Sequence, residues 1–350
     1  MNHDQAFIVA EISANHGHDI DIVKETMMAA KEIGCDAVKI QTYRPDTMTL
    51  DCDNEYFQLN NGTIWDGTTL FKLYQEAFLP WEWHQELFAY AAQNDLLLFS
   101  TPFDKTAVDL LEQCGNPLYK IASFEITDIP LIQYVAARKK PMIISTGIAT
   151  EAEIQEAVEA CRAVGNHQIS LLKCTSQYPA PIEDANLLTM QDMAERFGVT
   201  TGLSDHTEGF IVAVTAVAMG AKIVEKHFIL DRKIGGPDAS FSMEPKEFEY
   251  MIKKIREAEL SMGKVSYELN EGKQRSRKYA RSLFVIRDVK EGDLVTEENV
   301  RSIRPSDGMP PKLYSAVLGK VFRCDVKAGT PLQWELLDGP PAFQKGTGCG

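Results

Sequence analysis

The feature that most constrains the fold is a regular alternation of strand-like and helix-like runs, which starts within the first ten residues. Each of eight short apolar runs precedes a run whose apolar residues recur at helical period. The strand-like runs are residues 7–11, 37–41, 96–100, 118–121, 141–145, 168–173, 199–203 and 222–225. Such alternation favours a parallel sheet, and eight units in about 260 residues predict a (β/α)₈ TIM barrel.

A doubly wound open sheet is the alternative for the same alternation, but no glycine-rich dinucleotide fingerprint follows the first strand-like run. One unit of the barrel pattern is unusually long. Residues 42–80 separate the second strand-like run from the next long helix and mix turn signals with aromatic residues. Loops of this length in compact domains are usually functional or disordered, and the aromatic content favours an ordered, functional loop.

The chain divides by composition into a large and a small part. The barrel pattern covers residues 1–262, and the polar, charged stretch 263–278 is interpreted as a linker. Residues 279–338 form a β-rich module of short strands and turns, followed by a glycine- and proline-rich tail at 339–350. Within the module, DVKEGDLVT at 288–296 is similar to DVKAGTPLQ at 325–333, which predicts an internally duplicated β fold.

Charge and cysteine content narrow the class of protein. The net charge of −14 argues against a nucleic-acid partner or an anionic membrane surface, because both require basic patches. No apolar run reaches the roughly 18–20 residues of a membrane span, and the N-terminus lacks the pattern of a secretory signal. The seven scattered cysteines form no C-x-x-C motif, which predicts a reduced, cytoplasmic protein.

Two lysines lie inside otherwise apolar strand-like runs, Lys39 in AVKIQ and Lys120 in LYKIAS. Lysines are rarely buried without a partner, and the carboxyl ends of barrel strands carry the active site. With nearby strand-end hydroxyls they would bind a phosphate or a phosphate-carboxylate ligand. The alternatives are structural ion pairs with strand-end carboxylates and a Schiff-base aldolase that uses Lys120. The hydroxyls are Thr101, Ser123, Ser145 and Ser204, and the carboxylates are Glu11, Glu125 and Glu225.

Two histidines, His206 and His227, follow the last two strand-like runs and would point into the same mouth of the barrel. Neutral imidazoles suit Mn, Fe, Co or Zn, and neighbouring carboxylates shift the preference toward Mn or Mg. Hydrogen-bonded core histidines are the structural alternative. In the loop after the first strand, His16 is expected to contact substrate and His18 to be exposed to solvent.

At this point eight short motifs carry a resemblance. AEISANHG, VKIQTY, FSTPFD, YKIASFEITD, IISTG, CTSQYPAP, GLSDHT and EKHF, in this order, resemble the sialic acid synthase family across the whole barrel. RSLFV, IRP and GKV after residue 279 are similar to the C-terminal antifreeze-like (SAF) domain of the same enzymes. Within the family, NNGTIWDGTTLFKLYQEAFLPWEWH most resembles the pseudaminic acid synthases.

The resemblance implies roles for individual residues. The implied phosphoenolpyruvate site is Lys39, Thr101, Lys120, Ser123, Ser145, Ser176 and Ser204, although Ser176 departs from the asparagine of sialic acid synthases. The implied sugar contacts are Gln41, Glu125, Tyr178, Asp238 and Arg304. The implied metal ligands are His206 and His227, and the implied catalytic groups are Glu11, Glu225 and Lys120.

The family's reaction is the metal-assisted condensation of phosphoenolpyruvate with an open-chain N-acetyl amino sugar and water. C3 of phosphoenolpyruvate attacks the sugar aldehyde, water adds at C2, and phosphate leaves by C–O cleavage. The resemblance implies 2,4-diacetamido-2,4,6-trideoxy-L-altrose as the sugar, with N-acetylneuraminate or legionaminate synthesis as the alternative. It further implies Mn²⁺, with Mg²⁺ or Co²⁺ as other candidates, and a domain-swapped homodimer in which Arg304 reaches the partner's site. A sugar- or ice-binding protein without catalysis is the non-enzymatic alternative.

Overall fold

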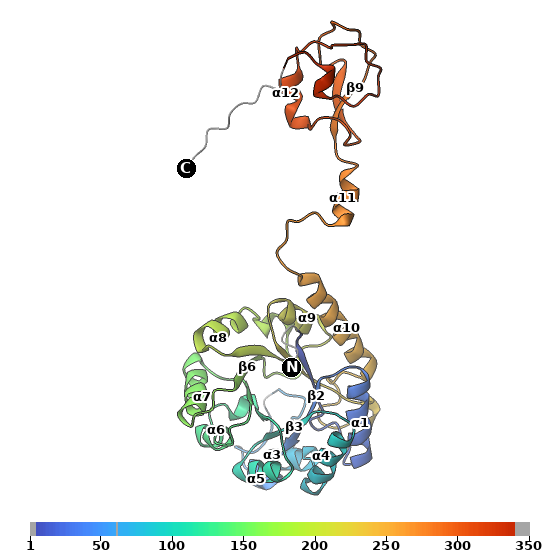
Figure 1. Ribbon diagram of the computed structural model, residues 1–350. Helices are drawn as coiled ribbons and strands as arrows, with labels where there is room; N and C mark the ends of the chain where they lie inside the picture. The colour runs from blue at the N-terminus through green and yellow to red at the C-terminus, as the bar shows by residue number, and fades with distance from the viewer. Residues whose placement is uncertain (1–4, 61, 340–350) are drawn as a thin grey trace. The chain divides into compact units, whose positions relative to one another are not determined.

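Eight parallel strands close into a barrel in this computed structural model, which describes residues 5–60 and 62–339 (Figure 1). Each strand pairs with its neighbour in the chain, and the eighth pairs with the first. The strands are β1 Phe7–Glu11, β2 Ala37–Thr42, β3 Leu98–Pro102, β4 Tyr119–Ile121, β5 Met142–Ser145, β6 Ile169–Cys174, β7 Thr200–Asp205 and β8 Ile223–His227. The predicted (β/α)₈ barrel is therefore confirmed.

A ring of helices surrounds the strands (Figure 1). These are α1 Ile20–Glu32, α2 Pro45–Met48, α3 Leu70–Ala77, α4 His84–Gln93, α5 Lys105–Gln113, α6 Ile129–Ala136, α7 Glu151–Ala163, α8 Thr189–Phe197, α9 Ile211–Ala218 and α10 Pro245–Met262. Short 3₁₀ turns lie at η1 Trp81–Trp83, η2 Ser123–Glu125, η3 Ile182–Ala185 and η4 Arg232–Ile234. Within the described ranges, no helix is long and apolar enough to cross a membrane.

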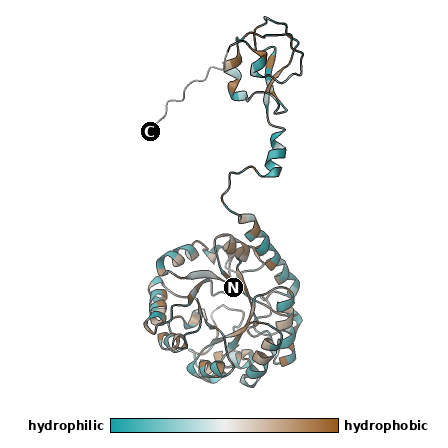
Figure 2. Ribbon diagram, viewed as in Figure 1, coloured by the Kyte–Doolittle hydropathy of each residue, from teal (hydrophilic) through white to brown (hydrophobic). Residues whose placement is uncertain are grey.

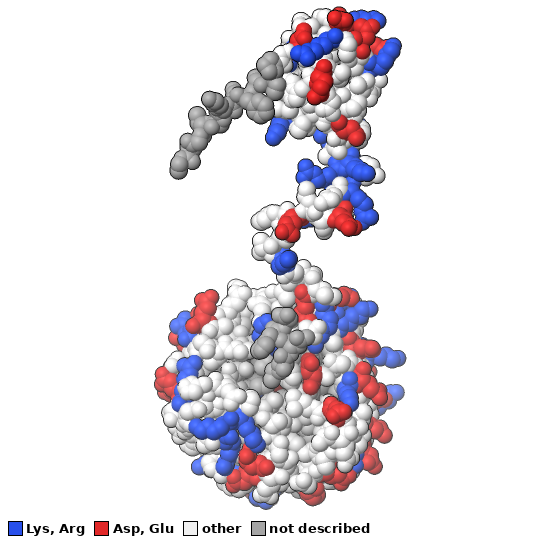
Figure 3. Space-filling model, viewed as in Figure 1, with Lys and Arg blue, Asp and Glu red and all other residues white. Residues whose placement is uncertain are grey.

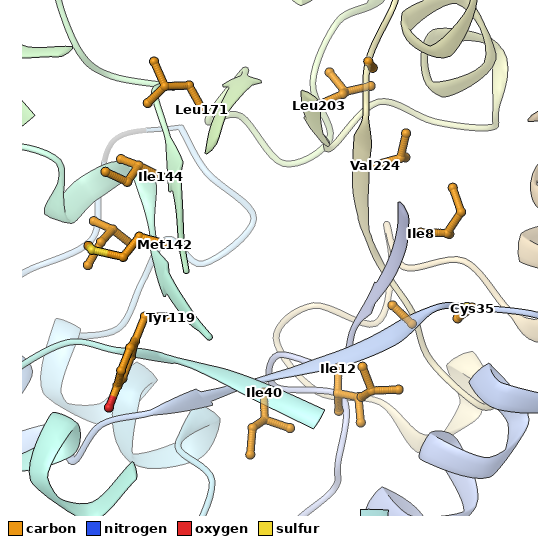
Figure 4. Close-up of a cluster of buried hydrophobic side chains, with 14 of the residues drawn as sticks. Ile8, Ile12, Cys35, Ile40, Tyr119, Met142, Ile144, Leu171, Leu203 and Val224 are labelled. Atoms are coloured by element: carbon orange, nitrogen blue, oxygen red, sulfur yellow. The ribbon is translucent and has the colours of Figure 1, made fainter. Parts of the chain in front are cut away.

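The two faces of each strand bury different cores. Outward side chains such as Ile40, Ile144 and Val224 pack between strands and helices (Figure 4). Inward side chains form a smaller apolar floor of Val9, Ala37, Phe99, Leu118, Ile143, Leu172 and Ile223. Gly202 completes that floor, because a Cβ there would lie 2.3 Å from the Ile223 carbonyl oxygen. Alternation along each strand then fixes which later residues face the barrel mouth.

Three strands end two residues beyond the predicted runs. β3 includes Thr101, β7 includes Asp205, and β8 includes His227. The predicted runs stop where apolar residues stop, but the parallel backbone ladder continues beneath polar side chains. Thr101, for example, still pairs with Gln41 on β2. These strand ends are the positions from which side chains enter the mouth.

The chain separates into two compact units, Met1–Gly263 and Lys264–Gly350. In the second unit, α11 Glu271–Arg277 lies within the stretch interpreted as a linker, and it is hydrophilic and mostly basic at its surface (Figures 2 and 3). Beyond it, β9 Ser282–Val285 pairs antiparallel with β10 Val300–Ile303 over a separate apolar core. The remaining elements are η5 Pro311–Leu313, α12 Tyr314–Val317 and η6 Trp334–Leu336. The predicted tail lies outside the described residues from 340 onward.

In the structure of the small unit, the two copies of the sequence repeat pair with each other. Val289 and Val326 exchange both backbone hydrogen bonds, at 2.9 and 3.0 Å. Around them, Lys290 pairs with Asp325 and Lys327 pairs with Asp288, each at 2.6 Å. Equivalent positions of the two DVK segments therefore face one another across an approximate twofold relation. This confirms the internally duplicated β fold predicted from the repeat.

Candidate active site

The candidate site lies one layer above the apolar floor, at the carboxyl ends of the strands. Because side chains alternate along a strand, each residue two positions after a floor residue also points inward. These inward residues are polar on every strand, and all of them are buried. In strand order they are Glu11, Lys39, Thr101, Lys120, Ser145, Cys174, Ser204 and Glu225, and His227 follows two residues later on β8. All eight strands thus contribute to this layer, and the apolar floor separates it from solvent on one side.

Lysines and carboxylates form one cluster in this layer. Lys39 Nζ lies 3.1 Å from Glu11 Oε2 and 3.0 Å from Glu225 Oε1. Lys120 Nζ lies 3.3 Å from the same Glu225 oxygen. The ion pairs of the structural alternative are therefore present for two of its three carboxylates. Pairing does not preclude ligand binding, since a bound phosphate can compete with the carboxylates for the ammonium groups.

The environments of the two carboxylates push their pKa values apart. Burial opposes ionisation of Glu225, but Lys120 and Lys39 outweigh it and lower the pKa to about 2. Burial raises the pKa of Glu11, and the nearby charge of Glu225 adds to the rise. Burial lowers the pKa of Lys120, whereas for Lys39 the two carboxylates outweigh burial and raise it. Lys39 opposes the rise at Glu11, so the pKa of one buried carboxylate is lowered and that of the other is raised.

Hydroxyl groups line the same layer. Lys39 Nζ donates to Thr101 Oγ1 at 3.3 Å, and Ser204 Oγ donates to Glu225 Oε1 at 3.4 Å. Ser123 and Ser176 join two different loops through an Oγ to Oγ contact of 2.5 Å. This contact depends on Gly147, whose added Cβ would lie 2.1 Å from Ser176 Oγ. The phosphoenolpyruvate-binding residues implied by the resemblance therefore lie around one mouth.

Several buried polar atoms of this mouth lack a hydrogen-bond partner among the described residues. They include Glu225 Oε2, Ser145 Oγ, Glu125 Oε2 and His227 Nδ1. Buried polar groups in folded proteins are nearly always satisfied, so a cluster of exceptions indicates a place where ligand or water binds. All four belong to residues that sequence analysis assigned to the site.

His206 and His227 lie side by side, with ring centroids 5.4 Å apart. His206 Nδ1 bonds the Thr175 carbonyl at 2.9 Å, which directs the Nε2 lone pair of that ring away from the backbone. Burial lowers the pKa of His227 well below its usual value, and that ring is therefore neutral, as a metal ligand must be. The orphaned His227 nitrogen and the paired imidazoles fit a divalent ion such as Mn²⁺. In the part of the chain that the structure describes, no third His, Cys, Asp or Glu completes a metal-binding group.

A buried ion pair joins the strands that carry the two histidines. Lys226 Nζ lies 2.7 Å from Asp205 Oδ2, and the two residues are partners in the β7–β8 register. Lys226 also donates to the Thr207 carbonyl, while the Thr207 backbone N–H and hydroxyl donate to Asp205. Each member of the pair precedes a histidine directly in sequence. The pair therefore fixes the separation of the two strand ends from outside the barrel.

The residues assigned to sugar binding lie on the same side as the histidines or next to the lysines. Asp238 Oδ2 lies 3.8 Å from His227 Nδ1, and the Tyr178 ring lies 4.4 Å from the His206 ring. Gln41 Nε2 donates to Glu11 Oε1 at 2.9 Å. Burial raises the pKa of Glu125 to about 7 despite the opposing charge of Lys120.

Arg304 belongs to the second unit and is exposed there. Within residues 264–339, no hydrogen bond or ion pair holds its guanidinium group. It is the one assigned site residue that belongs to the second unit and not to the barrel unit.

The expected substrate contact at His16 is wrong. That ring is 1 % exposed, its Nε2 lies 3.1 Å from the Ala77 carbonyl, and its Nδ1 accepts the His18 backbone N–H. His18 is exposed, as expected, yet its Nε2 bonds the Glu76 carbonyl at 2.7 Å. Both histidines therefore anchor the end of α3, the last part of the long 42–80 excursion, and leave no His16 nitrogen for substrate.

Sequence reasoning missed some residues that the structure brings to this region. Lys226 had the same signal as Lys39 and Lys120, a lysine in an apolar strand, and that signal could have found it. Cys174 lies 3.8 Å from His206 Nδ1, and its place as the inward residue of β6 follows from strand alternation. Trp65, from the long excursion, lies against Tyr178, and no local pattern predicts that contact.

Comparison with known proteins identifies the family to which this chain belongs. The NeuB family profile matches residues 26–267, and the SAF domain profile matches residues 280–338. The chain is 47% identical to the pseudaminic acid synthase of Helicobacter pylori over 95% of its own length and 97% of that protein. It is 36% identical to the N,N'-diacetyllegionaminic acid synthase of Legionella pneumophila, over 95% of this chain and 94% of that one.

A solved structure shows the same fold. The N-acetylneuraminic acid (sialic acid) synthetase of Leptospira borgpetersenii superposes with a TM-score of 0.69 at 29% identity. The match covers 78% of this chain and 90% of that one. Fold, strand-end residues and sequence comparison agree, and the chain belongs to the NeuB family, the sialic acid synthase family that its barrel motifs resemble, with a C-terminal SAF domain.

Proposed function

We propose that this chain is a pseudaminic acid synthase, which condenses phosphoenolpyruvate with 2,4-diacetamido-2,4,6-trideoxy-L-altrose and water to give pseudaminic acid and phosphate. The observation that carries the proposal is the layer of buried lysines, carboxylates and histidines at one barrel mouth, in a chain 47% identical to a pseudaminic acid synthase. Legionaminate or N-acetylneuraminate synthesis is the second candidate, supported by the 36% identity to a legionaminic acid synthase.

The lysine side of the mouth suits phosphoenolpyruvate. Lys39 and Lys120 offer two buried cations, and the hydroxyls of Thr101, Ser145 and Ser204 offer donors around them. Charge-assisted hydrogen bonds of this kind are about twice as strong as neutral ones. When phosphate binds, it competes with Glu225 for the lysine ammonium groups, which frees the carboxylate for chemistry.

The histidine side of the mouth suits the sugar aldehyde. A divalent ion held by His206 and His227 would act as a Lewis acid toward the aldehyde oxygen. Asp238 and Tyr178 lie next to these rings and would contact the sugar hydroxyl or acetamido groups. Mn²⁺ is the proposed ion, and Mg²⁺ or Co²⁺ are the other candidates, because imidazole with carboxylate and water suits these metals.

The two carboxylates suit opposite proton-transfer roles. Glu225, held ionised by two lysines, has a free Oε2 that would accept a proton from the attacking water. Glu11, whose pKa is raised, would hold a proton near the reacting carbonyl. Pairs of groups with opposite pKa shifts are a common signature of acid and base partners. Lys120 joins them as a second cation beside the ionised carboxylate, 3.3 Å from Glu225 Oε1.

We further propose a cytoplasmic location, which the free thiols of the six described cysteines support.

We also propose a domain-swapped homodimer, supported by the SAF domain and by an exposed, unpaired Arg304. Mixed dimers of His227→Ala and Arg304→Ala test it. With Arg304 acting on the partner's barrel, each mixed dimer contains one complete site, and activity at low sugar concentration recovers. With Arg304 acting on its own barrel, no site is complete and activity stays low.

The direct test of the function is phosphate release from phosphoenolpyruvate with Mn²⁺ and each candidate sugar. The proposal predicts turnover with the 2,4-diacetamido-2,4,6-trideoxy-L-altrose. Turnover only with N-acetylmannosamine would contradict the pseudaminic assignment and leave the family assignment intact. Borohydride trapping of a covalent lysine adduct, with activity insensitive to EDTA, would favour the aldolase alternative instead.

A further inference from the structure

The long excursion between β2 and α4 contains a hydrogen-bonded turn, which precedes α3 and carries Trp65. The backbone of Leu59 pairs with Thr68 and Gly67, and Gln58 bridges to Thr69. At the tip, the Asp66 carboxylate accepts the backbone N–H groups of Gly62 and Thr63. The turn is therefore ordered by its own hydrogen bonds, and it presents Trp65 in one position.

Trp65 reaches across to segments that belong to the histidine side of the mouth. Its indole Nε1–H donates to the Pro237 carbonyl at 3.0 Å, which directly precedes Asp238. Its ring centroid lies 5.5 Å from that of Tyr178. Tyr178 in turn lies 4.4 Å from His206 and 5.4 Å from Phe241, and Phe241 lies 5.0 Å from His227. We call Trp65, Tyr178 and Phe241 the aromatic wall.

The aromatic wall is only partly buried, although large aromatic rings usually gain most by full burial. Two of its rings, Tyr178 and Phe241, lie directly beside the two histidines. In the proposed function, the lysines bind phosphoenolpyruvate on one side of the mouth, and the sugar lies on the side of the two histidines. A six-carbon chain spans roughly 6 Å, given carbon–carbon bonds of about 1.5 Å. The Tyr178 ring lies 4.4 Å from the His206 ring, so a sugar held at the histidines reaches the Tyr178 end of the aromatic wall, which Trp65 extends.

We propose that Trp65 is a specificity-determining residue, which with Phe241 and Tyr178 forms an apolar wall for the methyl-terminated, 6-deoxy end of the sugar. The inference rests on the proposed function. A methyl group gains by leaving water for an aromatic face, whereas a hydroxymethyl group there would lose hydrogen bonds to water. Apolar pockets discriminate a single added hydroxyl by no more than about 100-fold, so the expected preference is modest.

The test compares two sugars that differ only at C6, the 2,4-diacetamido-2,4,6-trideoxy hexose and its 6-hydroxy counterpart. Phosphate release gives kcat/KM for each sugar with the wild type, Trp65→Phe and Trp65→Gln. Phenylalanine keeps an aromatic face and loses the donor to Pro237, while glutamine keeps a donor and loses the face. Ile64→Ala is the matched control, because Ile64 precedes Trp65 in the same turn and is 50% exposed.

The wild type, Trp65→Phe and Ile64→Ala are expected to prefer the 6-deoxy sugar by about 10- to 100-fold. Trp65→Gln is expected to reduce that preference to about threefold or less, through the sugar KM, with the phosphoenolpyruvate KM unchanged. An unchanged preference in Trp65→Gln, or an equal loss with both sugars, would overturn the inference alone. No turnover of either sugar by the wild type would overturn the proposed function, and the inference with it.

Discussion

The two sides of the barrel mouth solve the problem of burying polar groups in different ways. On the lysine side, Lys39, Lys120, Glu11 and Glu225 are all charged or chargeable, and ion pairs of 3.0–3.3 Å join them. On the histidine side, the two imidazole rings pack against aromatic rings, and His227 Nδ1 has no hydrogen-bond partner among the described residues. Opposite charges are paired on the first side, whereas within the described ranges no opposite charge lies within ion-pair distance of the paired rings on the second except Asp238, 3.8 Å from His227 Nδ1.

Both sides arise from one rule, a polar residue placed two or four positions after a residue of the apolar floor. What differs is the neighbour on the adjacent strand. The sides meet on β8, where Glu225 belongs to the charged cluster and His227, two residues on, belongs to the ring cluster. The comparison teaches that loss of a group should affect stability and phosphate binding on the charged side, and metal binding on the histidine side.

The largest expected effect is the loss of turnover in His227→Ala. Removing one of only two imidazoles should abolish Mn²⁺ binding and reduce kcat by at least about 1,000-fold. The fold should be retained, because the ring makes no hydrogen bond that the fold requires. Isothermal titration with Mn²⁺ and a phosphate-release assay measure both quantities. His167→Ala, at an exposed position, is the matched control, and an active, metal-binding His227→Ala protein would contradict the assignment.

The next effect is a loss of stability in Lys39→Met. The substitution leaves Glu11 and Glu225 buried together without the cation between them, and breaking a buried ion pair costs about 3–5 kcal/mol. Urea denaturation should show that decrease in the free energy of unfolding. A decrease below about 1 kcal/mol would mean that the charged side does not depend on this pairing.

Lys226→Met tests the ion pair behind the histidines. It leaves Asp205 buried without its cation, so the free energy of unfolding should fall by about 3 kcal/mol. Mn²⁺ affinity should fall by about 10- to 100-fold, as is usual when groups that orient metal ligands are lost. The double variant Asp205→Leu/Lys226→Met should recover most of the stability but not the affinity. Full recovery of both would show that the pair has no role in positioning the histidines.

The smallest expected effect is the pH dependence contributed by Glu125. Its pKa is raised from 4.5 to about 7, so the folded state binds this proton more tightly than the unfolded state. The associated stability is fully present below pH 4.5 and is lost as the pH rises through about 7. Relative to Glu125→Gln, the wild type should lose up to about 3 kcal/mol of unfolding free energy between pH 5 and pH 7.5. Parallel pH profiles for the two proteins would contradict this.

The fold could be predicted because its signals are local and repeated. Alternating apolar runs specify each strand and helix, and Thr150 with Glu153 forms the predicted capping box. The predicted strands end too early, because the backbone hydrogen bonds of the sheet continue at polar residues such as Thr101. The mouth residues could be predicted for a similar reason, since strand alternation alone directs them inward.

The contacts of the long excursion could not be predicted in the same way. His16 looked like a ligand from its motif, but a carbonyl 61 residues away satisfies it. Trp65 meets a carbonyl 172 residues away, and no periodicity encodes such a contact. No local sequence pattern predicts where Arg304 lies relative to the barrel, because Arg304 belongs to the second unit, which has its own apolar core.

The most direct test of the two-sided mouth is calorimetric titration of His227→Ala and Lys120→Met with Mn²⁺ and, separately, with phosphoenolpyruvate. Lys120→Met should lose phosphoenolpyruvate affinity by at least about tenfold and still bind Mn²⁺, since the ammonium group contacts only the charged side. His227→Ala should lose Mn²⁺ binding and still bind phosphoenolpyruvate. The reverse pattern, or loss of both ligands in both variants, would contradict the division of the mouth into a phosphate side and a metal side.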